Sequence, residues 1–244
     1  MRLTAQERAA RVQAFRRMNA AEKLEYIFSY YKLPIVLFLI LLYIAGYGIF
    51  KTISRKEVLL YVGFCNVAVS EELELALTDG FVTDTGDSPQ KKQVYAYPNL
   101  YLSENPDPAY HEYAYASRMK LQAAVHAKQL DVVLMNREAY DMLSGNGYLM
   151  ELSSGVLPDA LYRSLRDCLT ENKVVLEDNE LALALGEEEE YRETAVYQVN
   201  GIDLSQLPLI RTAELTDAVF LGILPNSPRL DTVTEYLVRL ASGL

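Results

Sequence analysis

Leu130-Asp-Val-Val-Leu-Met-Asn136 is the stretch of this chain that indicates its fold most directly. Its apolar residues form a short continuous run, which is typical of a strand buried on both faces of a parallel sheet. Asn136 ends the run, and residues 137–143 carry the pattern of a helix. A strand followed at once by a helix is the repeating unit of α/β proteins.

The same alternation continues on both sides of this unit. Apart from 130–135, we predict strands at 58–66, 93–102, 173–176, 181–185, 194–199 and 219–224. Helices are expected at 71–77, 109–128, 158–168 and 228–240. Alternation of this kind predicts one α/β domain over residues 58–244, with a mostly parallel sheet.

An apolar run precedes this domain. Leu33–Phe50 reads LPIVLFLILLYIAGYGIF and contains no charged residue. Its 18 residues are just long enough to cross a bilayer as a helix, so we predict a single transmembrane helix. The alternatives are a buried helix of a soluble protein and a cleaved signal peptide. Against the second, the run is long and no small-residue cleavage site follows it.

The charges on the two sides of this run differ in sign. Residues 1–32 hold seven Arg and Lys against three Glu, a net charge of +4. Residues 57–244 hold 13 basic and 30 acidic residues, a net charge of −17. The positive-inside rule therefore predicts a cytoplasmic basic arm (1–32), a membrane helix in contact with lipid (33–50), a juxtamembrane linker (51–57) and an extracytoplasmic domain. An acidic outer domain argues against nucleic acid as a partner.

Two capping boxes predict helices in the N-terminal arm. Thr4-Ala-Gln-Glu7 would open a short helix that extends to about Arg17. Asn19-Ala-Ala-Glu22 would open a second helix that runs without a break into the apolar stretch, where Pro34 is expected to tilt or kink it.

Parts of the outer domain resemble extracellular solute-binding proteins, the receptors of ABC importers. The resemblance lies in Leu130–Asn136 with the helix after it, in Gly147–Leu152 (GYLMEL), and in Val219–Leu240 (VFLGILPNSPRLDTVTEYLVRL). It implies a lobe of α/β structure that binds a solute. Such receptors consist of two lobes. Here only about 45 residues separate Glu151 from Val196, where the second lobe would have to fit. The resemblance therefore implies a single, reduced lobe.

A second resemblance covers almost the whole chain. Glu22–Lys32, Leu60–Asn66 and Asn200–Ser205 are similar to segments of a group of uncharacterised single-pass membrane proteins of Gram-positive anaerobes. This resemblance implies the same architecture, a membrane helix followed by an outer domain, and implies no activity.

No catalytic motif is present in the sequence. It contains no GxSxG, no P-loop and no HExxH, and its two histidines, His111 and His126, lie 15 residues apart. We therefore predict that the protein is not an enzyme and has no cofactor and no metal site. The two cysteines, Cys65 and Cys168, are too few for a disulfide scaffold, which leaves open a single bridge or two buried free thiols.

Two sets of residues are candidates for binding. In open α/β sheets, ligands gather at the carboxyl ends of strands. The polar residues predicted there are Asn66, Asn99, Asn136, Asn200 with Gly201 and Asp203, and Asn226. Asparagine also favours turns for purely local reasons, and that alternative stays open. The second set is a partner surface of Tyr97, Tyr101 and Tyr113, which could instead be ordinary packing.

The sequence thus predicts a cell-membrane protein with a cytoplasmic N-terminus and a non-enzymatic outer domain. That domain would resemble a solute-binding protein and bind a protein partner or a small solute at the cell surface. The alternative is an accessory or assembly subunit of a membrane transporter or an envelope complex.

Overall fold

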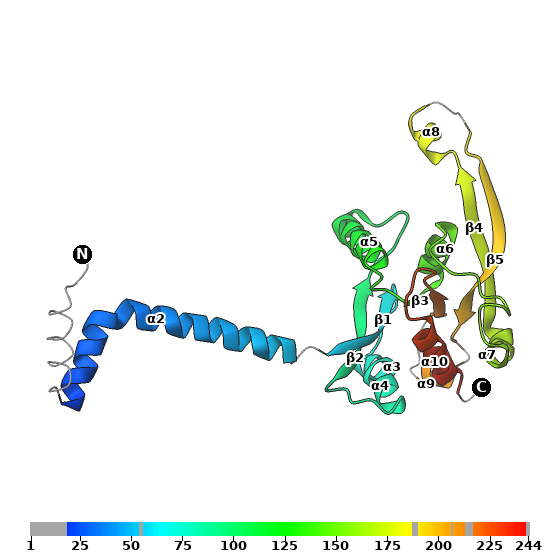
Figure 1. Cartoon of the computed structure of the whole chain (residues 1–244). Coiled ribbons are helices and arrows are strands. Elements are labelled where there is room, and N and C mark those ends of the chain that lie inside the picture. Colours follow the sequence, from blue (N-terminus) through cyan, green and yellow to red (C-terminus); the bar gives the residue numbers. More distant parts are fainter. Residues whose placement is uncertain (1–18, 54–55, 187–189, 206, 213–216, 243–244) are drawn as a thin grey trace. The chain divides into compact units, whose positions relative to one another are not determined.

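The computed structural model describes residues 19–53, 56–186, 190–205, 207–212 and 217–242 (Figure 1). The predicted helix from Thr4 to about Arg17 lies outside these residues. Contacts along the chain divide it into two compact units, Met1–Arg55 and Lys56–Leu244. The two units are described separately below.

The described part of the first unit is one helix, α2 (Ala20–Ile53). It begins with the predicted capping box: the Asn19 amide donates to the Glu22 carboxylate at 2.9 Å, and the Glu22 amide donates to Asn19 Oδ1 at 2.9 Å. This reciprocal pair confirms the predicted start of the helix. Pro34 lies inside the helix, and Figure 1 shows a bend in its N-terminal part.

No helix within the described residues meets the length and apolarity that a membrane span requires.

The second unit is an α/β domain with one six-stranded sheet, which confirms the predicted α/β class. The strands are β1 (Glu57–Cys65), β2 (Lys92–Leu100), β3 (Val132–Met135), β4 (Leu169–Asp178), β5 (Glu193–Asp203) and β6 (Phe220–Ile223). The helices are α3 (Glu71–Leu77), α4 (Asp79–Asp84), α5 (His111–His126), α6 (Arg137–Gly145), α7 (Asp159–Leu165), α8 (Glu180–Ala184), α9 (Pro208–Thr212) and α10 (Leu230–Ala241). Two 3₁₀ turns, η1 (Pro108–Tyr110) and η2 (Arg166–Cys168), precede α5 and β4.

The sheet is mixed, in the order β2-β1-β3-β6-β5-β4. β2, β1 and β3 pair in parallel, as predicted, whereas the other three pairs of neighbouring strands are antiparallel, so the sheet is parallel in one half only. β6 pairs antiparallel with β3 on one side and with β5 on the other, and β4 and β5 form an antiparallel hairpin. β6 therefore lies in the middle of the sheet, between β3, which comes much earlier in the chain, and β5, the strand that directly precedes it in sequence.

Helices cover both faces of the sheet. Figure 1 shows α5 and α6 on one side and α3, α4 and α10 on the other. Leu60, Val62 and Phe64 of β1 pack against α3, α4, α7 and α10 in one core cluster. Alternate residues of β1 and β3 point the other way, where Cys65 and Val133 pack against α5 and α6. The period of two along a strand accounts for this division.

The two cysteines belong to opposite faces. Cys65 lies in the cluster under α5 and α6, and Cys168 lies in the cluster under α7 and α10. Both are buried free thiols, so the structure contains no bridge between them. Burial raises the pKa of each thiol above its ordinary value, so both thiols stay protonated.

One predicted strand is wrong. Residues 181–185 (LALAL) do not form a strand, and most of them lie in helix α8 at the tip of the β4–β5 hairpin. Leucine and alanine are among the strongest helix formers, and no neighbouring strand is in place there to pair with them.

The buried carboxylate of Asp131, just before β3, binds β1 and the turn between β6 and α10. Asp131, which is fully buried, accepts from the Tyr61 amide at 2.8 Å, from the Ser227 hydroxyl at 2.5 Å and from Arg229 Nε at 2.9 Å. The Arg229 guanidinium in turn lies 4.7 Å from the centre of the Tyr61 ring. Asp131 and Ser227 come from two of the stretches that resemble solute-binding proteins, so these stretches meet in space.

We expect Asp131→Ala to lower the free energy of unfolding by about 3–5 kcal/mol, because it leaves the buried partners of the carboxylate without an acceptor. Urea denaturation of the purified chain, followed by tyrosine near-ultraviolet circular dichroism, measures the change. Glu235→Ala on the exposed face of α10 is the control, with an expected change within about 0.5 kcal/mol. Equal effects of the two substitutions would contradict the role given to Asp131.

Candidate functional site

The polar residues predicted at the strand ends are mostly occupied with structural hydrogen bonds. Asn66 follows β1 with a φ of 56°, and its side chain exchanges two hydrogen bonds with the backbone of Leu102, at 2.6 and 2.8 Å. Asn136 caps α6, where its Oδ1 accepts from the Ala139 amide at 3.0 Å. The backbone N–H of Asn136 donates to the carbonyl of Cys65, so Asn66 and Asn136 follow neighbouring strand ends, as predicted.

Asn99 lies one residue before the end of β2, also with a positive φ of 56°. It sits where the β1–β2 register shifts, and it is exposed. The Tyr113 hydroxyl donates to its carbonyl oxygen, which ties α5 to this bulge. Of the predicted strand-end residues, Asn99 is the one whose side chain faces solvent most fully.

Asn200 and Gly201 lie inside the domain, where β5 passes under α6. Asn200 is fully buried, accepts from the Tyr140 hydroxyl at 2.9 Å and donates to the Ser144 hydroxyl at 2.8 Å. A Cβ on Gly201 would lie 2.5 Å from the Tyr140 ring, so glycine is needed there for close packing. Burial raises the pKa of Tyr140, which keeps its hydroxyl as a donor.

Asp203 and Asn226 lie at opposite ends of the strands of the sheet. Asp203 pairs with Phe220, which pairs with Met135, so it lies at the level of the carboxyl end of β3. Asn226 follows β6, which runs the other way, and its side chain donates to the Val125 carbonyl at 2.7 Å. The expectation that Asn226 shares an edge with the others is therefore wrong, because β6 is antiparallel to β3.

The predicted tyrosine surface is divided into two groups. Tyr101 stacks on Tyr113 with ring centres 6.1 Å apart, between the end of β2 and the start of α5. Tyr97 belongs to a second group with Tyr61 and Tyr95, with ring centres 6.4 and 5.0 Å from it. Lys120 lies 5.4 Å from the centre of the Tyr97 ring. Partial burial raises the pKa of Tyr97, so its hydroxyl remains neutral near pH 7.

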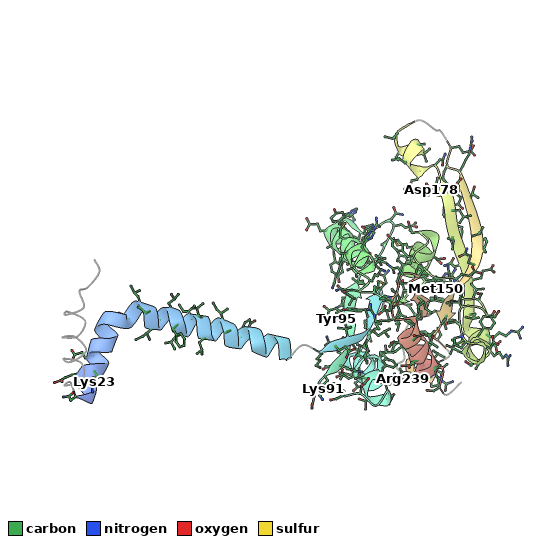
Figure 2. The ribbon with its side chains drawn as sticks, viewed as in Figure 1. Lys23, Lys91, Tyr95, Met150, Asp178 and Arg239 are labelled. Atoms are coloured by element: carbon green, nitrogen blue, oxygen red, sulfur yellow. The ribbon has the colours of Figure 1, made fainter. Side chains whose placement is uncertain are left out.

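A cleft of about 710 Å³ lies on the α5–α6 side of the domain, and we call it the arm cleft. Its second wall comes from the far part of the β4–β5 hairpin, residues 173–186 and 190–197, which we call the arm and which pairs with no strand outside the hairpin. Figure 1 shows this hairpin projecting past α6 with α8 at its tip, and Figure 2 labels Asp178 near that end. The cleft's volume falls within the range of about 300–1,000 Å³ that small-molecule sites occupy.

The arm cleft combines an apolar floor with polar walls. Leu102, Leu121 and Leu143 are buried beneath it, and Met142 and Leu183 add further apolar surface. The polar side chains are Glu104 and Asn105 before α5, Arg118 and Gln122 on α5, and Asn146 after α6. Tyr148, Glu180 and Tyr191 complete the lining, the last two from the arm.

Side chains of α6 hold the base of the arm against the domain. The Ser144 hydroxyl donates to the Lys173 carbonyl at 2.8 Å, and the Tyr140 hydroxyl lies 3.0 Å from the carbonyl oxygen of Thr170. Asn172 Nδ2 donates to Asp141 Oδ1 at 2.8 Å. These contacts involve residues 170–173, at the base of the arm. The residues that line the cleft from the arm lie farther along the hairpin.

A second hollow of about 480 Å³ lies on the other face, where α3, α9 and α10 meet. The cation that lines it, Arg239, is already paired with Asp84 at 2.5 Å. The arm cleft has more polar side chains without a partner and is the better candidate site. Within the described residues, no group of three or more His, Cys, Asp or Glu side chains is placed to hold a metal ion.

Sequence reasoning did not identify the arm cleft. Its charged residues, Glu104, Arg118 and Glu180, lie in no recognised motif, and residues 181–185 were predicted to be a strand rather than the helix at the arm's tip.

Comparisons with protein-family models, with curated proteins and with solved structures give no match to this chain.

Proposed function

We propose that the protein is a membrane-anchored, extracytoplasmic and non-enzymatic binding module that holds a small ligand in the arm cleft. The observation that carries this proposal is the cleft itself, an apolar floor with convergent polar side chains from two walls. The described residues that line it include two carboxylates, Glu104 and Glu180, but no histidine, serine, cysteine or lysine. The non-enzymatic part of the proposal rests on the sequence, in which no catalytic motif is present.

The arm comes from the part of the chain in which a full solute-binding protein would have its second lobe. Residues between Glu151 and Val196 fold as α7, β4, α8 and part of β5, and they add strands to the same sheet. The ligand would then lie between one lobe and a hairpin rather than between two lobes. This supports a reduced solute-binding module.

The apolar surface of α2 supports the anchor. Large apolar side chains remain 47–83% exposed around the helix, including Leu33, Phe38, Leu41 and Ile44. A helix that is apolar on every side is stable where lipid or protein surrounds it, and an isolated one would aggregate in water. The basic residues before α2 and the acidic domain after it favour an extracytoplasmic location for the domain.

A second candidate is an accessory subunit that holds a protein partner, and the outer surface of the arm favours it. Leu181 and Leu185, four residues apart at the tip of the arm, are 74% and 65% exposed, and Tyr197 on β5 is 69% exposed. Apolar side chains that are exposed close together mark sites of protein interaction. Glu177, Asp178, Glu180 and Glu190 flank them. A partner for this surface would present apolar side chains among basic ones, because the charges around the patch are negative.

We expect the chain to stay in the membrane fraction after alkaline carbonate extraction. Leu39→Arg combined with Leu42→Arg should release it, because each charge at a span's centre costs about 2.5–3.5 kcal/mol. The matched control is Leu39→Phe with Leu42→Phe, which keeps the run apolar. Extraction of the unsubstituted chain by carbonate would rule out the anchor.

For the ligand function, we expect at least one class of small solute to raise the melting temperature of the purified full-length chain. A ligand at a hundredfold excess over its dissociation constant should add about 5–10 °C for a domain of this size. Gln122→Trp, which fills the cleft, should abolish the shift, whereas Ala123→Trp on the exposed side of α5 should keep it. A panel of sugars, amino acids and peptides without any shift would exclude this version.

For the partner function, cross-linking in native membranes should capture a protein on the arm. Leu181→Asp with Leu185→Asp should abolish the capture, because it places charges within the apolar patch. Leu75→Asp on the exposed side of α3 is the control for an unrelated apolar side chain. Capture that persists in the double variant would show that the arm is not the contact.

A further inference from the structure

The arm cleft contains charged groups of both signs that are not paired with one another. Arg118 lies on α5, Glu104 lies on the same wall, and Glu180 lies on the arm. Arg118 Nη2 donates to the Ser103 carbonyl at 3.2 Å, and its remaining N–H groups have no acceptor within the described chain. None of the five ion pairs among the described residues includes any of these three side chains.

These charges restrict the chemistry of the ligand. A metal cation or a polyamine would face Arg118, and a phosphate or another dianion would face two carboxylates. All three side chains are exposed in the free protein, and a neutral sugar would displace water from them without compensating any of the charges. A ligand that carries one charge of each sign satisfies both walls.

We propose that the ligand is a short peptide with free termini, a step that rests on the ligand-binding function proposed above. Its terminal carboxylate receives hydrogen bonds from the Arg118 guanidinium, which suits the planar geometry of a carboxylate. Its terminal ammonium group lies against Glu180 on the opposite wall. The cleft has room for more than one residue, so the two charges of the ligand are far enough apart to reach both walls.

The rest of the lining fits the middle of a peptide. Gln122 on α5 and Asn146 after α6 present amides, which both donate to and accept from peptide groups. Met142 and Leu183, which are half-buried, offer apolar surface to one or two side chains of the ligand. The site would therefore prefer peptides with apolar side chains.

The test uses the purified full-length chain and three tripeptide libraries, with free termini, with acetylated N-termini and with amidated C-termini. Size-exclusion separation followed by mass spectrometry measures which peptides stay bound. We expect retention of the free library, enriched in apolar members, and at least tenfold weaker retention of each blocked library. Equal retention of the three libraries would overturn the assignment.

Two substitutions assign the termini to the walls. Arg118→Gln should weaken retention of the free library by tenfold or more, and Arg118→Lys should restore part of it, because it keeps the charge but loses the fork of donors. Glu180→Gln should abolish the difference between the free and the acetylated libraries. Arg163→Gln and Glu235→Gln, exposed on α7 and α10, are the matched controls and should change nothing.

The same experiment separates this inference from the function on which it rests. A sugar such as maltotriose could raise the melting temperature, with the shift lost in Gln122→Trp, while no peptide is retained. That result would overturn the peptide assignment and leave the ligand function standing. No binding of peptides, sugars or amino acids would remove both.

Discussion

The second unit depends on a buried carboxylate, that of Asp131. It lies at the amino end of β3 and joins β1, through the Tyr61 amide, to the turn between β6 and α10, through Ser227 and Arg229. A buried charge is stable only when its hydrogen bonds are complete, so this carboxylate requires all three elements to be in place. The same contacts hold the turn after β6 next to the start of β3, beside which β6 pairs.

That insertion determines where the arm lies. With β6 beside β3, the next position in the sheet is taken by β5, and β4 becomes the edge strand. Only the last residues of β5 pair with β6, so most of the hairpin extends beyond the sheet and passes α6. Tyr140 and Ser144 hold its base through the buried Asn200. The cleft is the space that this arrangement leaves between the hairpin, α5 and α6.

The local features of the fold were accessible from the sequence because they depend on neighbours in the chain. The capping box at Asn19, the buried strand at 132–135 and the cap at Asn136 are of this kind. The direction of β6 depends on a partner some ninety residues away, so Asn226 was assigned to the wrong edge. Helix α8 was missed for a related reason, since leucine and alanine alternate there without a strand to pair with. The cleft depends on both features and could not be derived from single motifs.

The late position of β6 in the chain also affects when the domain can fold. Asp131 meets Ser227 and Arg229 across 96 and 98 residues, so the central sheet stays open until the segment that forms β6 and α10 has been made. Contacts of such long range slow folding, since a large loop must close before they form. The domain can therefore complete its fold only after its last strand and helix have been synthesised.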